Sequence, residues 1–332
     1  MTKPIAVFYE QQHWFKPLFA EMDRRGTLYE RINATEHSYS AEEHPERSFS
    51  LVLNRMSPSA WNRDHGDAIF YTLGFLDHLE RRGVRVINGL KAIRTELSKA
   101  AQLLLLESLD LPYPRARVIH RASQAAAATK DLRWPVVVKP NIGGSGAGVK
   151  RFDTIESLEA AAAGGELAFG LDSTALVQEF VPARGGHIVR VEVLNGRFLY
   201  AIKVHITGET FDLCPADICK TSGGVELDRA ACPVDAPKSG LRVEGYMPSP
   251  EVIADVERIM SHAGIELGGV EYMVDDRDGQ RLYYDINALS NFVADGPKVV
   301  GFDPFVKLVD WLEAEAARAN ARTTEPALAG AS

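Results

Sequence analysis

Cysteine and long apolar runs are scarce in this 332-residue sequence. The three cysteines, Cys214, Cys219 and Cys232, are an odd count without metal-ligand spacing, which predicts reduced thiols rather than a disulfide framework. No apolar run approaches the roughly 18 residues of a membrane span, and the first one ends at Glu10, too soon for a signal peptide. We therefore expect a cytoplasmic protein with no membrane partner.

Clustered positive charge is also absent. Lysine and arginine total 37 against 45 aspartate and glutamate residues, which gives a formal net charge of -8. This balance argues against nucleic acid as a partner, because phosphate backbones are bound by clustered positive charge. With 45% apolar and 25% charged residues, the composition is that of a folded protein of about two domains that needs no cross-links.

Hydrophobic periodicity near the N-terminus predicts alternating strands and helices, and hence a parallel sheet. The predicted strands there span residues 4–9, 49–54 and 84–87, and the predicted helices span 14–25 and 67–82. Two hairpins are predicted further along, around Asn195-Gly196 and Asp278-Gly279. The other predicted elements are strands at 135–139, 149–152 and 175–179 and helices at 96–109, 155–163, 251–263 and 304–317.

A glycine-rich loop, Gly143-Gly-Ser-Gly-Ala-Gly148, follows the predicted strand that ends at Lys139. A loop with few Cβ atoms lets backbone N–H groups approach phosphate oxygens closely. It is not a P-loop, because Gly148-Val149-Lys150 stands where Gly-Lys-Ser/Thr is needed, and it is not a Rossmann turn, because a strand follows. The loop therefore indicates a nucleotide-binding flap between two strands, with a purely structural loop as the alternative.

Residues 135–149 resemble the phosphate-clamping segment of ATP-grasp enzymes. Three further matches, Val86-Ile-Asn-Gly89, Ser98-Lys99 and Leu111-Pro-Tyr-Pro114, follow the order seen in ribosomal-protein glutamate ligases, glutathione synthetases and D-alanine–D-alanine ligases. The resemblance covers nearly the whole chain. It implies a fold that combines α/β and α+β parts, in which a Rossmann-like pre-ATP-grasp domain is followed by two α+β lobes that clasp ATP. The implied boundaries are 1–88 for the first domain, 89–182 for the central and small lobe, 183–318 for the C-terminal lobe and 319–332 for a disordered tail.

The same resemblance implies which residues bind ATP. Lys99 and Lys139 would face the phosphates, although Ser98 replaces the commoner aspartate. The loop would cover the phosphates through Gly143, Gly144, Ser145, Gly146 and Gly148. The hinge would hold adenine through Gln178, Glu179, Phe180 and Val181, mainly by the backbone of Glu179 and Val181.

A metal site is predicted on the second hairpin. The two-residue period of a strand places Tyr283, Asp285 and Asn287 on one face, and antiparallel pairing sets Glu271 opposite Asp285. Two carboxylates and an amide oxygen suit Mg²⁺, with Mn²⁺ as a second candidate. The family pattern is an acid followed by Glu-x-Asn, so Asp285 is a conservative departure. The alternative is a solvated sheet face, although directly opposed acids repel each other unless a cation lies between them.

The first hairpin carries further polar residues. Arg190 and Glu192 share one face, and Lys203 and His205 share one face of the partner strand. By the resemblance, Arg190 would lie near the transferred phosphoryl group and Lys203 would be a second basic catalytic residue. An exposed polar sheet face is the alternative.

Substrate contacts are the least defined part of the prediction. Arg55 or Arg63, in a loop after a predicted parallel strand, would hold a substrate carboxylate or, equally, backbone carbonyls. Ser290 and Asn291 stand where relatives often have Pro-Gly in the amine-binding loop. The segment 211–220 lies where these families bind substrate but matches none of them.

Together these residues imply an ADP-forming ligase that joins a small-molecule carboxylate, an amino acid or short peptide, to an amine through an acyl phosphate. Two alternatives stay open: a nucleotide-binding sensor without turnover, and a kinase-like phosphotransferase whose ATP site would look the same. The sequence leaves both a monomer and a homo-oligomer open.

Overall fold

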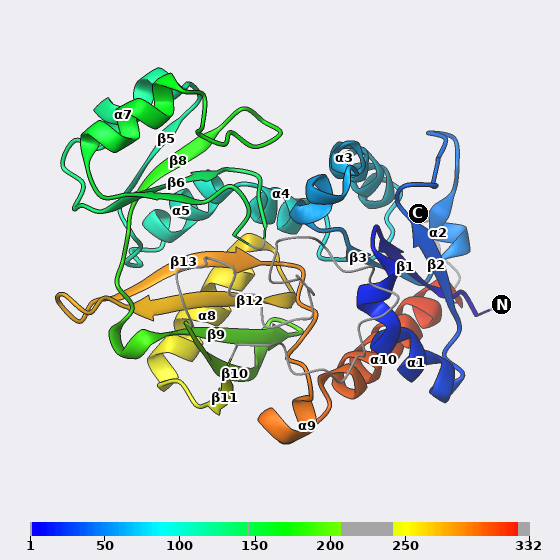
Figure 1. Ribbon diagram of the computed structural model, residues 1–332. Coiled ribbons are helices and arrows are strands. Elements are labelled where there is room, and N and C mark those ends of the chain that lie inside the picture. The colour runs from blue at the N-terminus through cyan, green and yellow to red at the C-terminus, as the bar shows by residue number, and fades with distance from the viewer. Residues whose placement is uncertain (1, 145, 207–241, 325–332) are drawn as a thin grey trace, which may run out of the picture.

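The computed structural model describes residues 2–144, 146–206 and 242–324 (Figure 1). Within these ranges the main strands form three sheets, one in an N-terminal domain, one in a small lobe and one in a C-terminal lobe. Ser145, the three cysteines and the segment 211–220 lie outside the described residues. None of the described helices is both long enough and apolar enough to cross a membrane.

The N-terminal domain contains a parallel sheet with the strand order β2-β1-β3-β4. Its strands are β1 (Ile5–Tyr9), β2 (Tyr29–Asn33), β3 (Leu51–Arg55) and β4 (Val86–Ile87). Residues of β1 and β3 enter a separate apolar core on each face of the sheet, so both strands are apolar nearly throughout, which confirms the prediction. The sequence did not predict the edge strand β2, because Glu30 and Arg31 interrupt its apolar residues.

Helices flank this sheet, including the two predicted at 14–25 and 67–82. They are η1 (Gln12–Phe15), α1 (Lys16–Arg25), α2 (Pro45–Ser48), η2 (Pro58–Arg63) and α3 (Gly66–Arg81). α1 ends at Gly26, whose φ of 69° is the left-handed conformation that glycine adopts most readily. On one side of the sheet α1 packs beside α10 (Pro304–Thr324), so both ends of the chain contribute to this domain (Figure 1).

The small lobe is an antiparallel sheet with the strand order β5-β8-β6-β7. Its strands are β5 (Ala116–Ile119), β6 (Val136–Pro140), β7 (Lys150–Phe152) and β8 (Ala175–Glu179), and its helices are η3 (Ala122–Gln124), α6 (Ala125–Ala128) and α7 (Ile155–Ala163). Apolar side chains of β6, β8 and α7 share one core, in which Leu158 is fully buried. Three of the four strands agree with the prediction, and β5 was missed because half of its residues are exposed.

The C-terminal lobe is built on a second antiparallel sheet, with the strand order β11-β10-β9-β12-β13. Its elements are η4 (Arg184–Gly186), β9 (His187–Leu194), β10 (Arg197–His205), β11 (Val243–Tyr246), α8 (Pro250–Ala263), β12 (Leu267–Val274), β13 (Arg281–Asn287) and α9 (Gly296–Val299). Asn195 and Gly196 join β9 to β10 with φ angles of 55° and 66°, as the predicted tight hairpin requires. α8 covers one face of the sheet, and apolar residues on the other face join the core that includes the N-terminal sheet.

Two predicted elements need correction. The single helix expected at 96–109 is two helices, α4 (Leu90–Leu97) and α5 (Lys99–Ser108). Ser98 breaks the helix because it has an extended backbone, and its Oγ accepts a hydrogen bond from the Ala101 N–H at 3.1 Å as the N-cap of α5. The disordered tail expected from residue 319 is wrong for residues 319–324, which extend α10.

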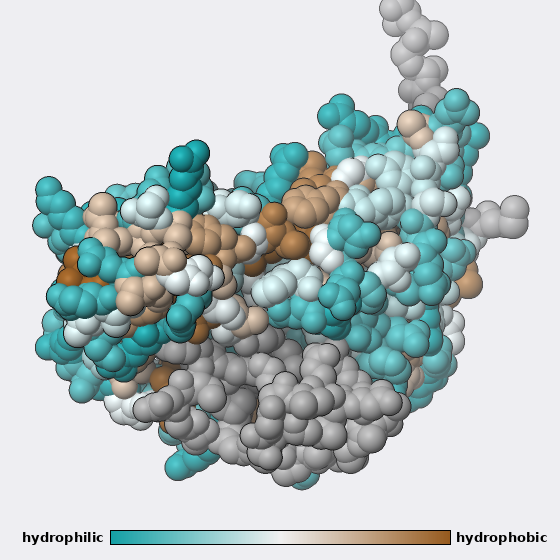
Figure 2. Space-filling view, turned by 45° about the horizontal axis from the view of Figure 1, so that its top comes forward, coloured by the Kyte–Doolittle hydropathy of each residue, from teal (hydrophilic) through white to brown (hydrophobic). Residues whose placement is uncertain are grey.

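The helices α4 and α5 pack against the C-terminal sheet, although they fall in the range that the resemblance assigned to the central and small lobe. Ala92 and Leu106 share a core with Val270 and Ile286. The small lobe meets the N-terminal domain at another place, and Figure 2 shows apolar side chains gathered between the two. One such contact sets Leu171 against Gly66, where an added Cβ would lie 3.0 Å from Leu171 Cδ1. The three sheets thus surround one central space.

Candidate active site

A cavity of about 770 Å³ lies between the three sheets. Most of the residues predicted from the sequence line it: Lys99, Lys139, Gly143, Gly144, Gly146, Gln178, Glu179, Phe180, Val181, Arg190, Glu271, Asp285, Asn287, Ser290 and Asn291. These residues come from α5, the small lobe and the C-terminal lobe, and Trp14 and residues 57–59 of the N-terminal domain complete the lining.

Two lysines mark one end of the cavity. Lys139 lies on β6 with 8% of its surface exposed, and burial lowers the pKa of its amine to about 7, with the positive charge of Lys99 acting in the same direction. Lys99 begins α5, and its Nζ lies 3.1 Å from Asp285 Oδ1 on β13. Two lysine side chains at one end of the cavity suit an anion with several negative charges.

The glycine-rich loop lies over this end. Gly146 and Gly148 have φ angles of 70° and 73°, which a residue with a side chain rarely adopts. At Gly144 an added Cβ would lie 2.8 Å from the Cβ of Ser59, so the loop approaches the N-terminal domain closely. Gly143, Gly144 and Gly146 line the cavity, whereas Gly148 contacts Pro140 and Ala168.

The predicted hinge forms the other end. Gln178 lies on β8, and its Oε1 is buried without a hydrogen-bond partner among the described residues. Phe180 and Val181 follow and line the cavity. The carboxylate of Glu179 accepts hydrogen bonds from the N–H and Nε of Arg133, at 3.0 and 3.1 Å. Such a pocket of apolar side chains and unpaired polar groups suits a flat heterocyclic base.

The predicted metal ligands converge. Glu271 pairs with Asp285 across β12 and β13, and Asn287 Nδ2 donates to Asp285 Oδ2 at 3.0 Å. Burial raises the pKa of Glu271. Burial acts in the same sense on Asp285, but the charges of Lys99 and Lys139 outweigh it, so the pKa of Asp285 is lowered.

These groups fit a hard divalent ion. They provide carboxylate and amide oxygens, the ligands that Mg²⁺ prefers in sites shared with phosphates. The described residues contain no cluster of three His, Cys, Asp or Glu side chains placed to hold a metal, because the third group here is an amide. Binding would require Glu271 and Asp285 to give up part of their pairing with Arg190 and Lys99.

A β-bulge corrects one part of this prediction. The register shifts between Glu271 and Tyr272, which leaves Tyr284 as the additional residue on β13. Tyr283 therefore faces α8, where its hydroxyl donates to Asp255 at 2.9 Å, and does not share a face with Asp285. Tyr284 points to the site instead, and its hydroxyl donates to Glu271 Oε2 at 2.6 Å.

Arg190 lies between two carboxylates. Its Nε lies 2.5 Å from Glu192 Oε1 and its Nη1 lies 3.0 Å from Glu271 Oε1. Both Arg190 and Glu192 are buried, which excludes the exposed sheet face considered for them. The guanidinium of Arg190 thus connects Glu271, a proposed metal ligand, to the buried carboxylate of Glu192.

The structure does not bring Lys203, predicted as a second basic catalytic residue, to the cavity. Lys203 pairs with Val189 across β9 and β10, whereas Ile202 pairs with Arg190, so Lys203 faces the opposite side of the sheet. There its Nζ lies 4.7 Å from the centroid of the Tyr246 ring. The strand period was applied correctly within each strand, but the sequence did not specify the register between them.

The two candidate substrate arginines also have other partners. Arg55 is 3% exposed and does not line the cavity; its Nη2 donates to the carbonyl oxygen of Ser290 and lies 3.4 Å from Asn291 Oδ1. It therefore holds the loop that contains Ser290 and Asn291, which is the backbone-carbonyl alternative. Arg63 forms an ion pair with Glu10, with its Nη2 at 2.6 Å from Oε2, so its guanidinium binds a carboxylate of the N-terminal domain itself.

Several lining residues were not predicted. Glu96 at the end of α4 is buried, and burial raises the pKa of its carboxyl to about 8. Its Oε1 accepts a hydrogen bond from the Leu289 N–H at 3.0 Å. Trp14, Ser57 and Ser59 line the cavity from the N-terminal domain. Nothing in the local sequence distinguishes these residues, since only the packing of the three sheets brings them together.

Sequence comparisons identify proteins that resemble this chain. A family model described as "D-ala D-ala ligase C-terminus" matches residues 105–215. The chain is 30% identical over 166 residues to a probable alpha-L-glutamate ligase of Teredinibacter turnerae, a match that covers 50% of this chain and 51% of the relative. It is 29% identical over 128 residues to a D-alanine–D-alanine ligase of Haemophilus influenzae, covering 37% and 41%. The matches thus span about half the length of these relatives or less.

The solved structures agree over a longer stretch. The ATP-grasp ligase PsnB in complex with a minimal precursor superimposes with a TM-score of 0.67 at 18% identity, covering 95% of this chain and 100% of that one. The same ligase with Mg and ADP gives a TM-score of 0.64 at 19% identity, covering 95% and 99%. This similarity concerns the fold.

Proposed function

We propose that the chain is an ADP-forming ligase of the ATP-grasp superfamily that joins a carboxylate to an amine. One observation carries the proposal: Lys99, Lys139 and Arg190 meet Glu271, Asp285 and Asn287 in a single cavity. Cations for phosphate and oxygen ligands for a divalent ion are the two requirements of phosphoryl transfer. The matched relatives are themselves described as ligases, which supports the same reaction type.

In this proposal ATP lies along the cavity, with its base at Gln178–Val181 and its phosphates at Lys99 and Lys139. The glycine-rich loop excludes water from the phosphates and contributes backbone N–H groups. Glu271, Asp285 and Asn287 hold Mg²⁺, or Mn²⁺ in its place. The bound ion supplies charge neutralisation at the phosphates.

The substrate carboxylate then attacks the γ-phosphate, which gives an acyl phosphate and ADP, and an amine displaces phosphate from the acyl group. In this proposal Arg190 holds charge that develops during transfer, since its guanidinium lies at the cavity beside Glu271 of the metal site. Trp14, Ser57 and Ser59 close the side where the substrates would lie. We propose an amino acid or short peptide as the carboxylate substrate, since the matched ligases act on such molecules by their names.

Hydroxylamine tests the reaction without knowledge of the natural amine. With Mg-ATP and a panel of amino acids and short peptides, the proposal predicts a hydroxamate together with equal amounts of ADP and phosphate. A kinase would instead give ADP and a stable phosphorylated product. AMP and pyrophosphate would refute transfer of the γ-phosphate, and ATP binding without turnover across the panel would favour a nucleotide sensor.

A further inference from the structure

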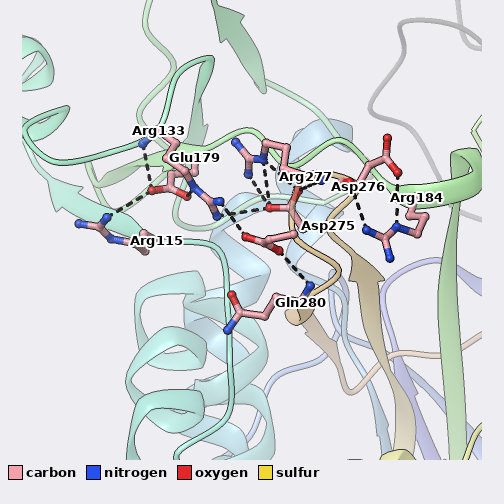
Figure 3. Close-up of polar contacts among 9 residues, drawn as sticks. Arg115, Arg133, Glu179, Arg184, Asp275, Asp276, Arg277 and Gln280 are labelled. Atoms are coloured by element: carbon pink, nitrogen blue, oxygen red, sulfur yellow. Dashed lines mark hydrogen bonds and ion pairs between the residues drawn. The ribbon is translucent and has the colours of Figure 1, made fainter.

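Arg133 connects the small lobe to the C-terminal lobe. It lies in the loop before β6, where its N–H and Nε donate to the two carboxylate oxygens of Glu179 (Figure 3). Its Nη1 lies 2.9 Å from Asp278 Oδ2 and its Nη2 lies 3.3 Å from Asp275 Oδ2, both in the turn between β12 and β13. One guanidinium thus contacts three carboxylates from two lobes.

Two of these carboxylates are buried, so water does not stabilise their charge. The side chains of Glu179 and Asp275 are 1% and 0% exposed. A buried carboxylate is tolerated when it is paired, and losing a partner costs more than the net worth of the pair. Asp275 has a second arginine, Arg277, whose Nη2 lies at 2.7 Å, whereas the closest partner of Glu179 other than Arg133 is Arg115 at 3.7 Å. The Glu179 end therefore depends mainly on Arg133.

Glu179 and the turn at Asp275, which Arg133 connects, each adjoin one end of the proposed nucleotide site. Glu179 is the last residue of β8, directly before Phe180 and Val181 of the base-binding hinge. The turn at Asp275 joins β12, which carries Glu271, to β13, which carries Asp285.

The chain just after the hinge is held by the same turn. The Asp276 N–H donates to the Pro182 carbonyl at 2.9 Å, and Arg184 Nη2 donates to the Asp276 carbonyl at 3.2 Å. The turn is itself closed by hydrogen bonds between Asp275 and residues 279 and 280. The turn is therefore attached to the hinge at several points, and Arg133 adds an attachment from the loop before β6 in the small lobe.

We propose that Arg133 is a positioning residue for ATP, which fixes the separation between the base-binding end of β8 and the hairpin that carries the metal ligands. The inference rests on the proposed function, because it assumes that one nucleotide spans both places. A ligand held at two points binds tightly only when the distance between the points is set in advance, since otherwise ordering the protein offsets part of the contact energy.

Two ligands separate this role from a general loss of stability. Calorimetric titration would compare ATP with tripolyphosphate, each with Mg²⁺, on the full chain and on Arg133→Ala. ATP spans both points, so we expect its Kd to rise at least about tenfold, whereas tripolyphosphate occupies only the phosphate end and should keep its Kd within about twofold. Arg133→Lys, which keeps the charge but not the fork, should give an intermediate Kd for ATP.

Arg115→Ala is the matched control, because it removes an arginine from the same carboxylate without breaking the link between the lobes; its Kd for ATP should stay close to that of the unchanged protein. If Arg133→Ala does not fold, the half-exposed Asp278 provides Asp278→Asn, which should weaken ATP binding selectively but by less. Equal losses for ATP and tripolyphosphate, or an unchanged Kd for ATP, would overturn the role of Arg133. Failure of the unchanged protein to bind ATP would instead overturn the proposed function.

Discussion

Lys139 should take up a proton when ATP binds. Its pKa is lowered to about 7 by burial and by the nearby charge of Lys99, against an ordinary value of 10.5. At pH 8 only about one tenth of the free protein then carries a charged Lys139. Phosphate oxygens beside the amine favour the ammonium form, so binding at pH 8 should draw about 0.8 proton from the buffer, whereas at pH 6 the lysine is already charged and uptake is small.

The same shift has a definite sign in stability. Between about pH 7 and pH 10 the unfolded chain holds a proton on Lys139 that the ligand-free folded protein does not. The contribution of this residue to the free energy of unfolding therefore rises with pH across that window. Binding of ATP should remove much of this rise, because it restores the proton to the folded state.

Calorimetry in two buffers of different ionisation enthalpy, such as phosphate and Tris, measures the proton uptake directly. Lys139→Met keeps most of the side-chain volume but cannot accept the proton, so the uptake at pH 8 should fall by most of one proton while other groups still contribute. The Kd for ATP should rise about 10- to 100-fold at pH 6, where a charge-assisted hydrogen bond is lost. Lys203→Met makes the same chemical change on the opposite face of the C-terminal sheet and should alter neither quantity. Equal uptake by Lys139→Met and the unchanged protein would refute contact between Lys139 and phosphate.

Two further predictions concern the metal ligands and the arginine beside them. Asp285→Asn and Asn287→Ala should each lower kcat by a factor of about 100 or more and change the Kd for ATP much less, since the metal acts on charge that moves during transfer. If turnover by the unchanged protein did not depend on added Mg²⁺, this prediction would be contradicted. Arg190→Ala should lower kcat at least about tenfold in a coupled ADP assay, whereas the kcat of Lys203→Ala should stay within about twofold of the unchanged protein. A larger loss of kcat in Lys203→Ala than in Arg190→Ala would refute the assignment of faces on β9 and β10.

Local sequence patterns predicted much of the fold, because apolar residues follow which positions of each strand and helix are buried. The apolar runs of β1 and β3 identified strands with neighbours on both sides, and Asn195-Gly196 identified a hairpin. The missed strands, β2, β5 and β11, are edge strands whose charged or exposed residues lack such a pattern. The split at Ser98 was missed because a serine can be either a residue within a helix or the cap of the next one.

The site could be predicted where one hairpin fixed the geometry and not where two segments had to be aligned. Glu271 meets Asp285 because both lie on strands joined by a short turn. The position of Tyr283 was wrong because a bulge of one residue reverses the faces beyond it, and nothing in the sequence marks that bulge. The role of Arg55 depends on the loop around Ser290, which is distant in sequence, so only the folded chain shows that it holds backbone.

The carboxylates of the proposed metal site are paired with cationic side chains in the free protein. Lys99 pairs with Asp285, and Arg190 pairs with Glu192 and Glu271, so no carboxylate of the proposed metal site lacks a cation nearby. Such pairing lets buried charges persist in the free protein, since each would otherwise carry a large desolvation cost. In the proposed reaction Lys99 would contact phosphate in place of Asp285, and Glu271 would hold the metal in place of its contact with Arg190. Arg190 would then turn part of its guanidinium toward the reacting groups only once both metal and nucleotide are in place, which would tie the chemical step to complete assembly of the site.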